Sequence, residues 1–233
     1  MKSEFKKETL EKFFGCDSDE LAAGDKNNQS IWLFGIEHGT FNTESKDINI
    51  DQNYSIETQS KWPYNVKAFK LLSVILGYSL NNYMDFANKY QPFVKGSKGF
   101  FKGNLYPYGF RSVSDFTEEV KRKTRFNTKE EYYEWCNKNR LPIINNWVEE
   151  YQPKIVIGVG ITRRDDFSLA VFGKNVEFKE YFFTINEHTK KIYYFVDGSR
   201  KLIVIPHFAG RYGLNSNLSI EKTGKFIEKL INE

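Results

Sequence analysis

Three short apolar runs, each followed by polar residues, constrain the fold of this chain most. They span residues 31–36, 154–159 and 202–206. Their apolar residues are nearly continuous and do not alternate with polar ones. That pattern is typical of strands buried on both faces of a parallel sheet. Because helical patterns separate the runs, the sequence predicts an α/β fold.

The remaining pattern predicts how the elements follow one another. Helix signals, including capping residues and prolines near helix starts, cover residues 63–76, 129–139, 142–152, 165–172 and 219–231. Further strands are expected at 176–185, 191–197 and 201–206, with turn residues at Asp197–Arg200. We therefore predict one three-layer α/β domain over residues 1–233, with a central, mostly parallel sheet. An antiparallel hairpin precedes the last motif, and residues 1–29 form an N-terminal helical extension.

Composition excludes several classes of protein. With 40% hydrophobic and 17% aromatic residues, the chain has enough apolar material for a buried core. Its net charge of +4 permits nucleic-acid binding but does not require it. Cys16 and Cys136 have no CxxC spacing, so neither a disulfide framework nor a cysteine zinc site is expected. The charged N-terminus and the short apolar runs predict a soluble, cytoplasmic protein without a membrane partner.

The first and last apolar runs end in residues that can perform chemistry. Glu37 and His38 follow the first run, and His207 and Arg211 follow the last. The carboxyl ends of parallel strands meet at one edge of a sheet, where ligands bind. We therefore expect these two loops to line one crevice. A metal site built from Glu37, His38 and His207 is conceivable by ligand type, but the spacing does not favour it, and no cofactor is predicted.

Three segments, taken together and in order, resemble the uracil-DNA glycosylase superfamily, and a further one, Gly103–Pro107, is similar to its middle segment. Gly35-Ile-Glu-His-Gly39 is similar to the water-activating motif of the mismatch-specific branch, with Glu37 in place of Asn and His38 in place of Pro. Gly103-Asn-Leu-Tyr-Pro107 is similar to the middle segment, where the family often has an Asn that reads the base edge. The segment from Arg140-Leu-Pro142 through Pro153–Gly160 is similar to the family's helix and the strand that follows it. Ile205-Pro-His207 resembles the closing strand that delivers the family's catalytic histidine or asparagine.

The resemblance implies hydrolysis of the N-glycosidic bond of uracil or another damaged base in DNA. Glu37 would position the attacking water, and His207 would stabilise the charge that moves onto the leaving base. Asn104 would read the base through its amide. Together with it, the predicted substrate-binding residues are Gly35, Ile36, His38, Phe41 and Tyr106. Basic and wedge-like residues predicted to hold the nucleic acid are Lys98, Lys102, Arg163, Arg211 and Tyr212.

Structural roles and other functions remain open at this point. Glu37 can equally cap a helix or pair with a lysine, and His207 can be a buried structural histidine. Asn104 lies in an ordinary turn sequence, and aromatic residues at this density often belong to the core. A non-catalytic module that binds DNA, RNA or a nucleotide in the same crevice is the main alternative function. A hydrolase acting on free nucleosides is a third, because a fold does not fix a function.

Overall fold

A six-stranded mixed sheet forms the centre of the molecule. The structure is a computed structural model, and it describes residues 18–37, 53–107 and 116–233. The strand order is β2-β1-β3-β6-β5-β4. Four neighbouring strands are parallel, and the hairpin β4–β5 joins them in antiparallel fashion at β6. The strands are β1 (Ile31–Gly35), β2 (Phe100–Asn104), β3 (Ile155–Val159), β4 (Lys179–Ile185), β5 (His188–Asp197) and β6 (Arg200–Ile205).

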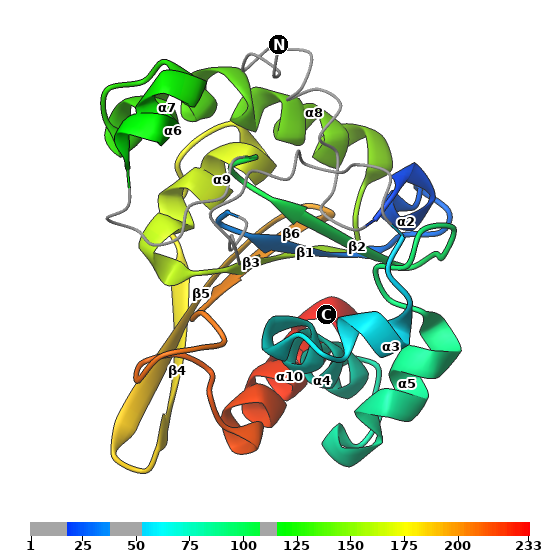
Figure 1. Cartoon of the computed structure of the whole chain (residues 1–233). Helices are drawn as coiled ribbons and strands as arrows, with labels where there is room; N and C mark the ends of the chain where they lie inside the picture. Colours follow the sequence, from blue (N-terminus) through cyan, green and yellow to red (C-terminus); the bar gives the residue numbers. More distant parts are fainter. Residues whose placement is uncertain (1–17, 38–52, 108–115) are drawn as a thin grey trace.

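Helices cover both faces of this sheet (Figure 1). On one face, called here the lower layer, lie α3 (Ile56–Gln59), α4 (Pro63–Ile75), α5 (Tyr83–Tyr90) and α10 (Asn217–Asn232), with the short helix η1 (Leu80–Asn82). The opposite, upper layer holds α2 (Glu20–Ala23), α6 (Glu118–Thr124), α7 (Lys129–Asn139), α8 (Leu141–Tyr151) and α9 (Arg164–Phe172), the last preceded by η2 (Ile161–Arg163). The prediction of an α/β domain with a mostly parallel sheet is confirmed.

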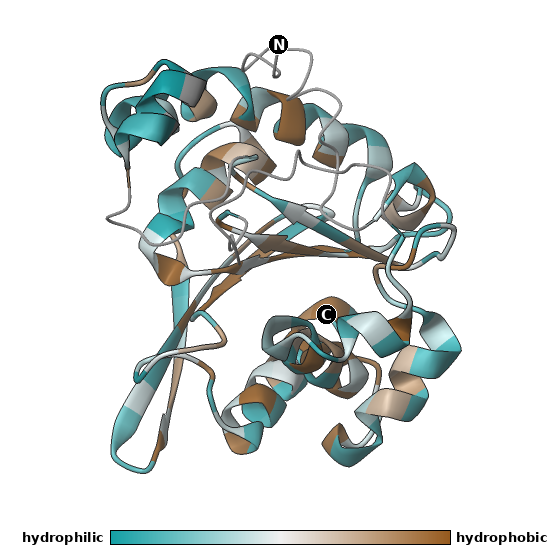
Figure 2. Cartoon of the chain, in the orientation of Figure 1, coloured by the Kyte–Doolittle hydropathy of each residue, from teal (hydrophilic) through white to brown (hydrophobic). Residues whose placement is uncertain are grey.

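Successive side chains of the central strands enter two separate cores. Ile31 and Leu33 of β1 pack into the lower core, whereas Trp32 and Phe34 pack into the upper core. All five residues of β1 are buried, as expected for a strand with helices on both faces. Colouring by hydropathy shows the apolar sheet between helices whose outer surfaces are polar (Figure 2). A side chain's position along a strand therefore decides which layer it meets.

Most of the elements predicted from sequence are present, and one strand was missed. The runs at 31–36 and 154–159 form β1 and β3, and Thr128 caps α7 as predicted. The segment 95–104, in which lysines alternate with glycines, is absent from the predicted strands and has the composition of a loop, but its last five residues form β2. Gly103 is needed there because a Cβ atom would approach the Phe34 ring to 2.8 Å. The helix expected over residues 3–14 lies outside the described residues.

The β4–β5 hairpin extends beyond the end of β6. Its two-residue turn, Asn186 and Glu187, has positive φ angles of 46° and 66°, as a type I′ turn requires. Tyr193 of β5 pairs with Val204, so the residues before Tyr193 continue past the carboxyl end of β6. The hairpin accordingly projects from the sheet in Figure 1. No helix among the residues that the structure describes has the length and apolarity needed to cross a membrane.

Close packing of α9 on the sheet gives a first testable prediction. A Cβ atom at Gly158 of β3 would lie 2.8 Å from the Phe167 ring of α9. We expect Gly158→Ala to lower the free energy of unfolding by about 1–3 kcal/mol, the usual cost of overpacking. Urea denaturation measures this loss. The double variant with Phe167→Leu should lose less than the sum of the two single variants, and simple additivity would contradict the close contact.

Candidate functional site

The carboxyl ends of the parallel strands form one edge, and the connections that follow the neighbouring strands β1 and β3 include helices on opposite faces of the sheet. Gly35 of β1 is level with Asn104 of β2 and Val159 of β3, and Val159 is level with Ile205 of β6. The chain after β1 continues to the helices of the lower layer, whereas the chain after β3 continues to α9 in the upper layer. Such a switch point opens a crevice that binds ligands in open α/β sheets.

On the lower side of this edge, Gly35, Asn104 and Tyr64 come together. A Cβ atom at Gly35 would collide with Oδ1 of Asn104 and would lie 3.7 Å from the Tyr64 hydroxyl oxygen. Glycine at the end of β1 therefore leaves room for the Asn104 amide. Asn104 is 5% exposed, and its backbone oxygen accepts a hydrogen bond from the buried Arg140 guanidinium at 3.0 Å. The hydrogen bond from Arg140 therefore holds in place the end of β2, which carries the Asn104 amide.

His207 lies on the same lower side, beside Tyr64. The centroids of the two rings are 6.0 Å apart. Nδ1 of His207 accepts a hydrogen bond from the Ala209 amide at 3.1 Å, so in the neutral imidazole the proton is on Nε2. Partial burial lowers the pKa of His207, and the charge of Lys67 lowers it further. The loop therefore offers a neutral imidazole that can donate a hydrogen bond through Nε2.

On the upper side, the carboxylate of Glu37 is held by α7. Its Oε1 accepts from Nζ of Lys129 and its Oε2 accepts from the Tyr133 hydroxyl, both at 2.9 Å. The side chains of Lys129 and Glu37 are 4% and 13% exposed. Burial raises the pKa of Glu37, although Lys129, Tyr133 and the charge of Arg163 oppose this shift. Glu37 is therefore a desolvated carboxylate with a raised proton affinity.

Tyr106 belongs to a buried network in the upper layer. Its hydroxyl donates to Asp166 at 2.6 Å, and its ring centroid is 4.4 Å from that of Tyr133. Asn137 donates to the same carboxylate at 2.8 Å, and Arg163 lies 3.4 Å from it. Burial, then the charge of Asp166, raises the pKa of Tyr106. Tyr106 is fully buried, so the prediction that it stacks on a bound base is corrected: it is a packing residue.

The structure does not bring the Glu37 carboxylate to the His207 imidazole. The ends of β1 and β6 flank β3, which puts their backbones roughly 10 Å apart at two strand spacings. Glu37 bonds to α7 in the upper layer, and His207 contacts Tyr64 of α4 in the lower layer. The two groups therefore lie on opposite sides of the strand ends instead of directly across one cleft.

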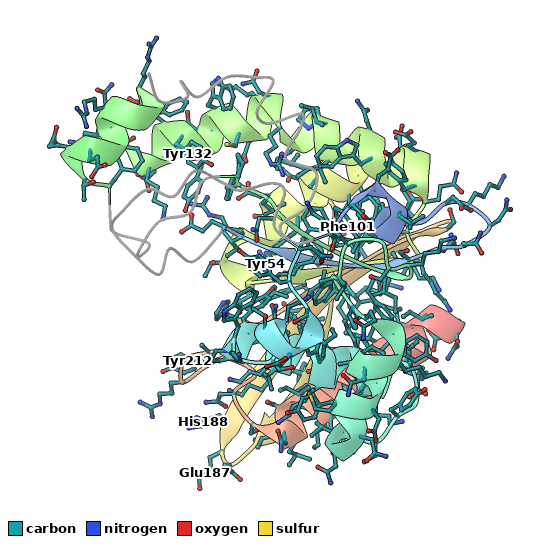
Figure 3. All side chains as sticks on the ribbon, turned by 45° about the vertical axis from the view of Figure 1, so that its right-hand side comes forward. Tyr54, Phe101, Tyr132, Glu187, His188 and Tyr212 are labelled. Atoms are coloured by element: carbon teal, nitrogen blue, oxygen red, sulfur yellow. The ribbon has the colours of Figure 1, made fainter. Side chains whose placement is uncertain are left out.

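Three of the five predicted nucleic-acid-binding residues lie at the carboxyl edge. The Arg163 guanidinium stacks 3.9 Å from the centre of the Tyr133 ring, beside Glu37. Arg211 and Tyr212 follow His207 in the loop after β6, and Tyr212 is 73% exposed. Figure 3 shows Tyr212 projecting away from the body of the molecule. These positions allow contact with a ligand at the edge.

The other two predicted contacts, Lys98 and Lys102, need correction. Lys98 precedes β2, so it lies at the amino edge of the sheet, where it lines a hollow with Asp25 and Asn28. Lys102, inside β2, turns toward the lower layer and donates to Oδ1 of Asn65 at 3.0 Å. The sequence prediction failed because β2 was read as a loop. Neither lysine lies where it could contact the phosphates of a nucleic acid bound at the carboxyl edge.

Several residues at the site were not predicted from the sequence. Tyr64 and Lys67 lie on α4, and Lys129 and Tyr133 lie on α7. Lys129 and Tyr133 are four residues apart, a helical spacing that places both on one face. Nothing in the sequence, however, linked that face to Glu37, which is 92 residues away from Lys129. His38 and Phe41 lie outside the described residues.

Two further observations bear on the type of site. Within the described ranges, no group of three or more His, Cys, Asp or Glu side chains is arranged to hold a metal ion. A comparison of the sequence with models of known protein families and with curated proteins found no match. The geometry of the strand ends is therefore the basis for a functional proposal.

The buried ion pair gives a prediction about stability. We expect Lys129→Met to lower the free energy of unfolding at pH 7 by about 1–3 kcal/mol, because Glu37 loses a charged partner in a desolvated site. Urea denaturation measures the loss. Lys138→Met is the matched control, since Lys138 is exposed on the same helix. Equal losses in the two variants would contradict a stabilising role of the pair.

The raised pKa of Glu37 predicts a pH dependence of opposite sign to that of a typical salt-bridged carboxylate. In the pH interval between the ordinary value of 4.5 and the raised pKa, the folded protein binds a proton that the unfolded chain has released. The contribution of Glu37 to stability is therefore present at low pH and is lost as the pH rises through this interval. Glu37→Gln lacks this loss, so its stability relative to wild type should improve as the pH rises.

Denaturation curves at several pH values test this dependence. Glu130→Gln is the control, because Glu130 is exposed on α7. A difference between Glu37→Gln and wild type that stays constant with pH would show that folding does not perturb the Glu37 carboxyl.

Proposed function

We propose that this protein is a glycosylase that hydrolyses the bond between uracil, or another damaged base, and its deoxyribose in DNA. One observation carries the proposal: the Asn104 amide and the His207 imidazole lie beside the same residue, Tyr64, at the carboxyl edge of the parallel strands. An amide can pair with the edge of a base, and a neutral imidazole can donate to a base oxygen. The three ordered motifs that resemble the uracil-DNA glycosylase superfamily support the same function.

His207 has the protonation state that this reaction needs. Breaking the C1′–N bond moves an electron pair onto the base and increases the negative charge on its oxygen. A donor aimed at that oxygen stabilises the transition state more than the ground state. Because Nδ1 accepts from the Ala209 amide, Nε2–H is the group available for this hydrogen bond. A lowered pKa keeps the imidazole neutral at physiological pH, as in other enzymes where imidazole acts as an electrophile.

Glu37 would position and deprotonate the attacking water, which requires a substrate that reaches from the His207 side of the strand ends to the α7 side. Lys129 and Tyr133 occupy one direction on each oxygen, and a carboxylate has about four lone-pair directions in total. With 13% of the side chain exposed, a water molecule can reach the remaining ones. The raised pKa increases the tendency of the carboxylate to accept a proton. The water oxygen would bond to C1′ as the base departs, and its proton would pass to Glu37.

A second function is favoured by one specific observation. Both oxygens of Glu37 already accept hydrogen bonds from α7, and the carboxylate lies on the opposite side of the strand ends from His207. A protein that used Asn104 and His207 only to bind a base would have no need for a mobile carboxylate at this position. The alternative is thus a non-catalytic module that binds DNA, or another nucleic acid or nucleotide, at the same edge.

Oligonucleotides that contain uracil, hypoxanthine or a mismatch distinguish the two functions. The glycosylase proposal expects abasic product, detected by alkaline cleavage. His207→Ala should lower the rate by about 10²–10³-fold, the usual cost of losing a transition-state donor. Glu37→Gln should lower it by about 10²–10⁴-fold, the usual contribution of a general base. His188→Ala is the matched control, because His188 lies next to Glu187 at the turn of the β4–β5 hairpin (Figure 3).

The outcomes separate clearly. No abasic product from any of these substrates would overturn the glycosylase proposal. Salt-dependent binding of DNA without product, weakened by Asn104→Ala, would select the binding module. Hydrolysis of free nucleosides without affinity for DNA would contradict both and would indicate a small-molecule hydrolase.

A further inference from the structure

Lys67 connects α4 to the loop that carries His207. It lies one helical turn after Tyr64, and its Nζ donates to the backbone oxygen of Phe208 at 2.5 Å. The Tyr64 ring contacts Phe208 as well, with ring centroids 5.1 Å apart. The same face of α4 therefore holds the side chain and the backbone of the residue that follows His207.

Backbone hydrogen bonds give the loop a defined conformation. The backbone oxygen of His207 accepts from the Leu214 amide at 2.8 Å, and Gly210 accepts from Gly213 at 3.1 Å. Within this turn, the Ala209 amide donates to Nδ1 of His207. A shift of the Phe208 peptide would move the Ala209 amide, since the two residues are adjacent. The hydrogen bond from Lys67 to Phe208 therefore helps to hold the Ala209 amide in place, and this amide donates to Nδ1 of His207 and so favours the Nε2–H tautomer.

Among the described residues, the charged groups that reach His207 or its loop are cationic. Lys67 is the charged neighbour from α4 that acts on His207, and Tyr64 of the same helix packs beside its ring. Lys190 of β5 reaches the loop through the Arg211 backbone oxygen at 3.2 Å, and the Arg211 side chain is exposed beyond it. A nearby ammonium group disfavours the imidazolium form of a histidine. Partial desolvation of the imidazole is the larger cause and acts in the same direction, although His207 as a whole residue is exposed.

We propose that Lys67 is a positioning residue that keeps His207 as a neutral hydrogen-bond donor facing the crevice. Lys67 would do so in two ways: its hydrogen bond to Phe208 fixes the turn, and its charge opposes protonation of the ring. The use of this donor in catalysis rests on the proposed glycosylase function. The tautomer and protonation state of His207 do not depend on that function, and they can be measured without a substrate.

Three substitutions at Lys67 separate the charge from the hydrogen bond. Lys67→Arg keeps both, Lys67→Gln keeps a donor but removes the charge, and Lys67→Met removes both. Lys70→Met is the matched control, because Lys70 lies on the same helix but donates to Asn217 of α10 at 3.0 Å. Urea denaturation identifies any variant that fails to fold.

Nitrogen-15 NMR of the histidine side chains, recorded as a function of pH, is the test. The chain has three histidines, and the His207 signals are assigned by their loss in His207→Gln. In wild type we expect the Nε2–H tautomer and a pKa below that of free imidazole. Lys67→Gln and Lys67→Met should both raise the pKa of His207, whereas Lys67→Arg and Lys70→Met should leave it unchanged. In Lys67→Met, the preference for the Nε2–H tautomer should also weaken.

Two results would overturn the inference. One is a His207 pKa that is the same in wild type, Lys67→Gln and Lys67→Met. The other is a wild-type spectrum in which the neutral ring carries its proton on Nδ1. If Lys67 only anchored the loop, Lys67→Gln and Lys67→Arg would have the same His207 pKa and only Lys67→Met would differ. That result would contradict the proposed role of the Lys67 charge. Because no substrate is present, a negative result here is distinct from a failure to cleave DNA. An inactive protein with the expected titration would still support the role of Lys67.

Discussion

The parallel register of β1 between β2 and β3 is the constraint on which the candidate site depends. It puts Gly35 level with Asn104 on one side and with Val159 on the other. A shift of one residue would turn every side chain of a strand to the opposite face. The Asn104 amide would then leave the Tyr64 side of the sheet, and the order of the two cores would be lost. Helix packing on both faces fixes this register, because each face of β1 is fully buried.

At the carboxyl edge, the histidine on one side has a lowered pKa and the carboxylate on the other side has a raised pKa. On the lower side, partial burial and then the charge of Lys67 lower the pKa of the His207 imidazole. On the upper side, Lys129 and Tyr133 hold a carboxylate whose pKa burial raises. One side therefore favours donation of a hydrogen bond to an oxygen, and the other favours acceptance of a proton. The proposed hydrolysis of a base–sugar bond would use both abilities.

Sequence reasoning succeeded where local pattern and long-range structure agree. The apolar runs that became β1 and β3 carry enough buried surface to specify strands by themselves. It failed at β2, where Lys102 and Gly103 resemble a loop, because the reasons for these residues lie elsewhere in the chain. Gly103 makes room for Phe34, and Lys102 bonds to Asn65. The errors for Lys98 and Lys102 followed from this missed strand, since a residue before a parallel strand lies at the edge away from the site.

The sequence alone determined the fold class and the residues that end β1, β3 and β6, because nearly continuous apolar runs have few other uses in a protein of this size. It could not determine which side of the sheet each of these residues faces. Only the tertiary structure decided that Glu37 meets α7, that His207 meets α4 and that Tyr106 is buried. The physical reason is that these contacts join segments far apart in the chain. The buried side chains can pair only when both helical layers are packed on the sheet.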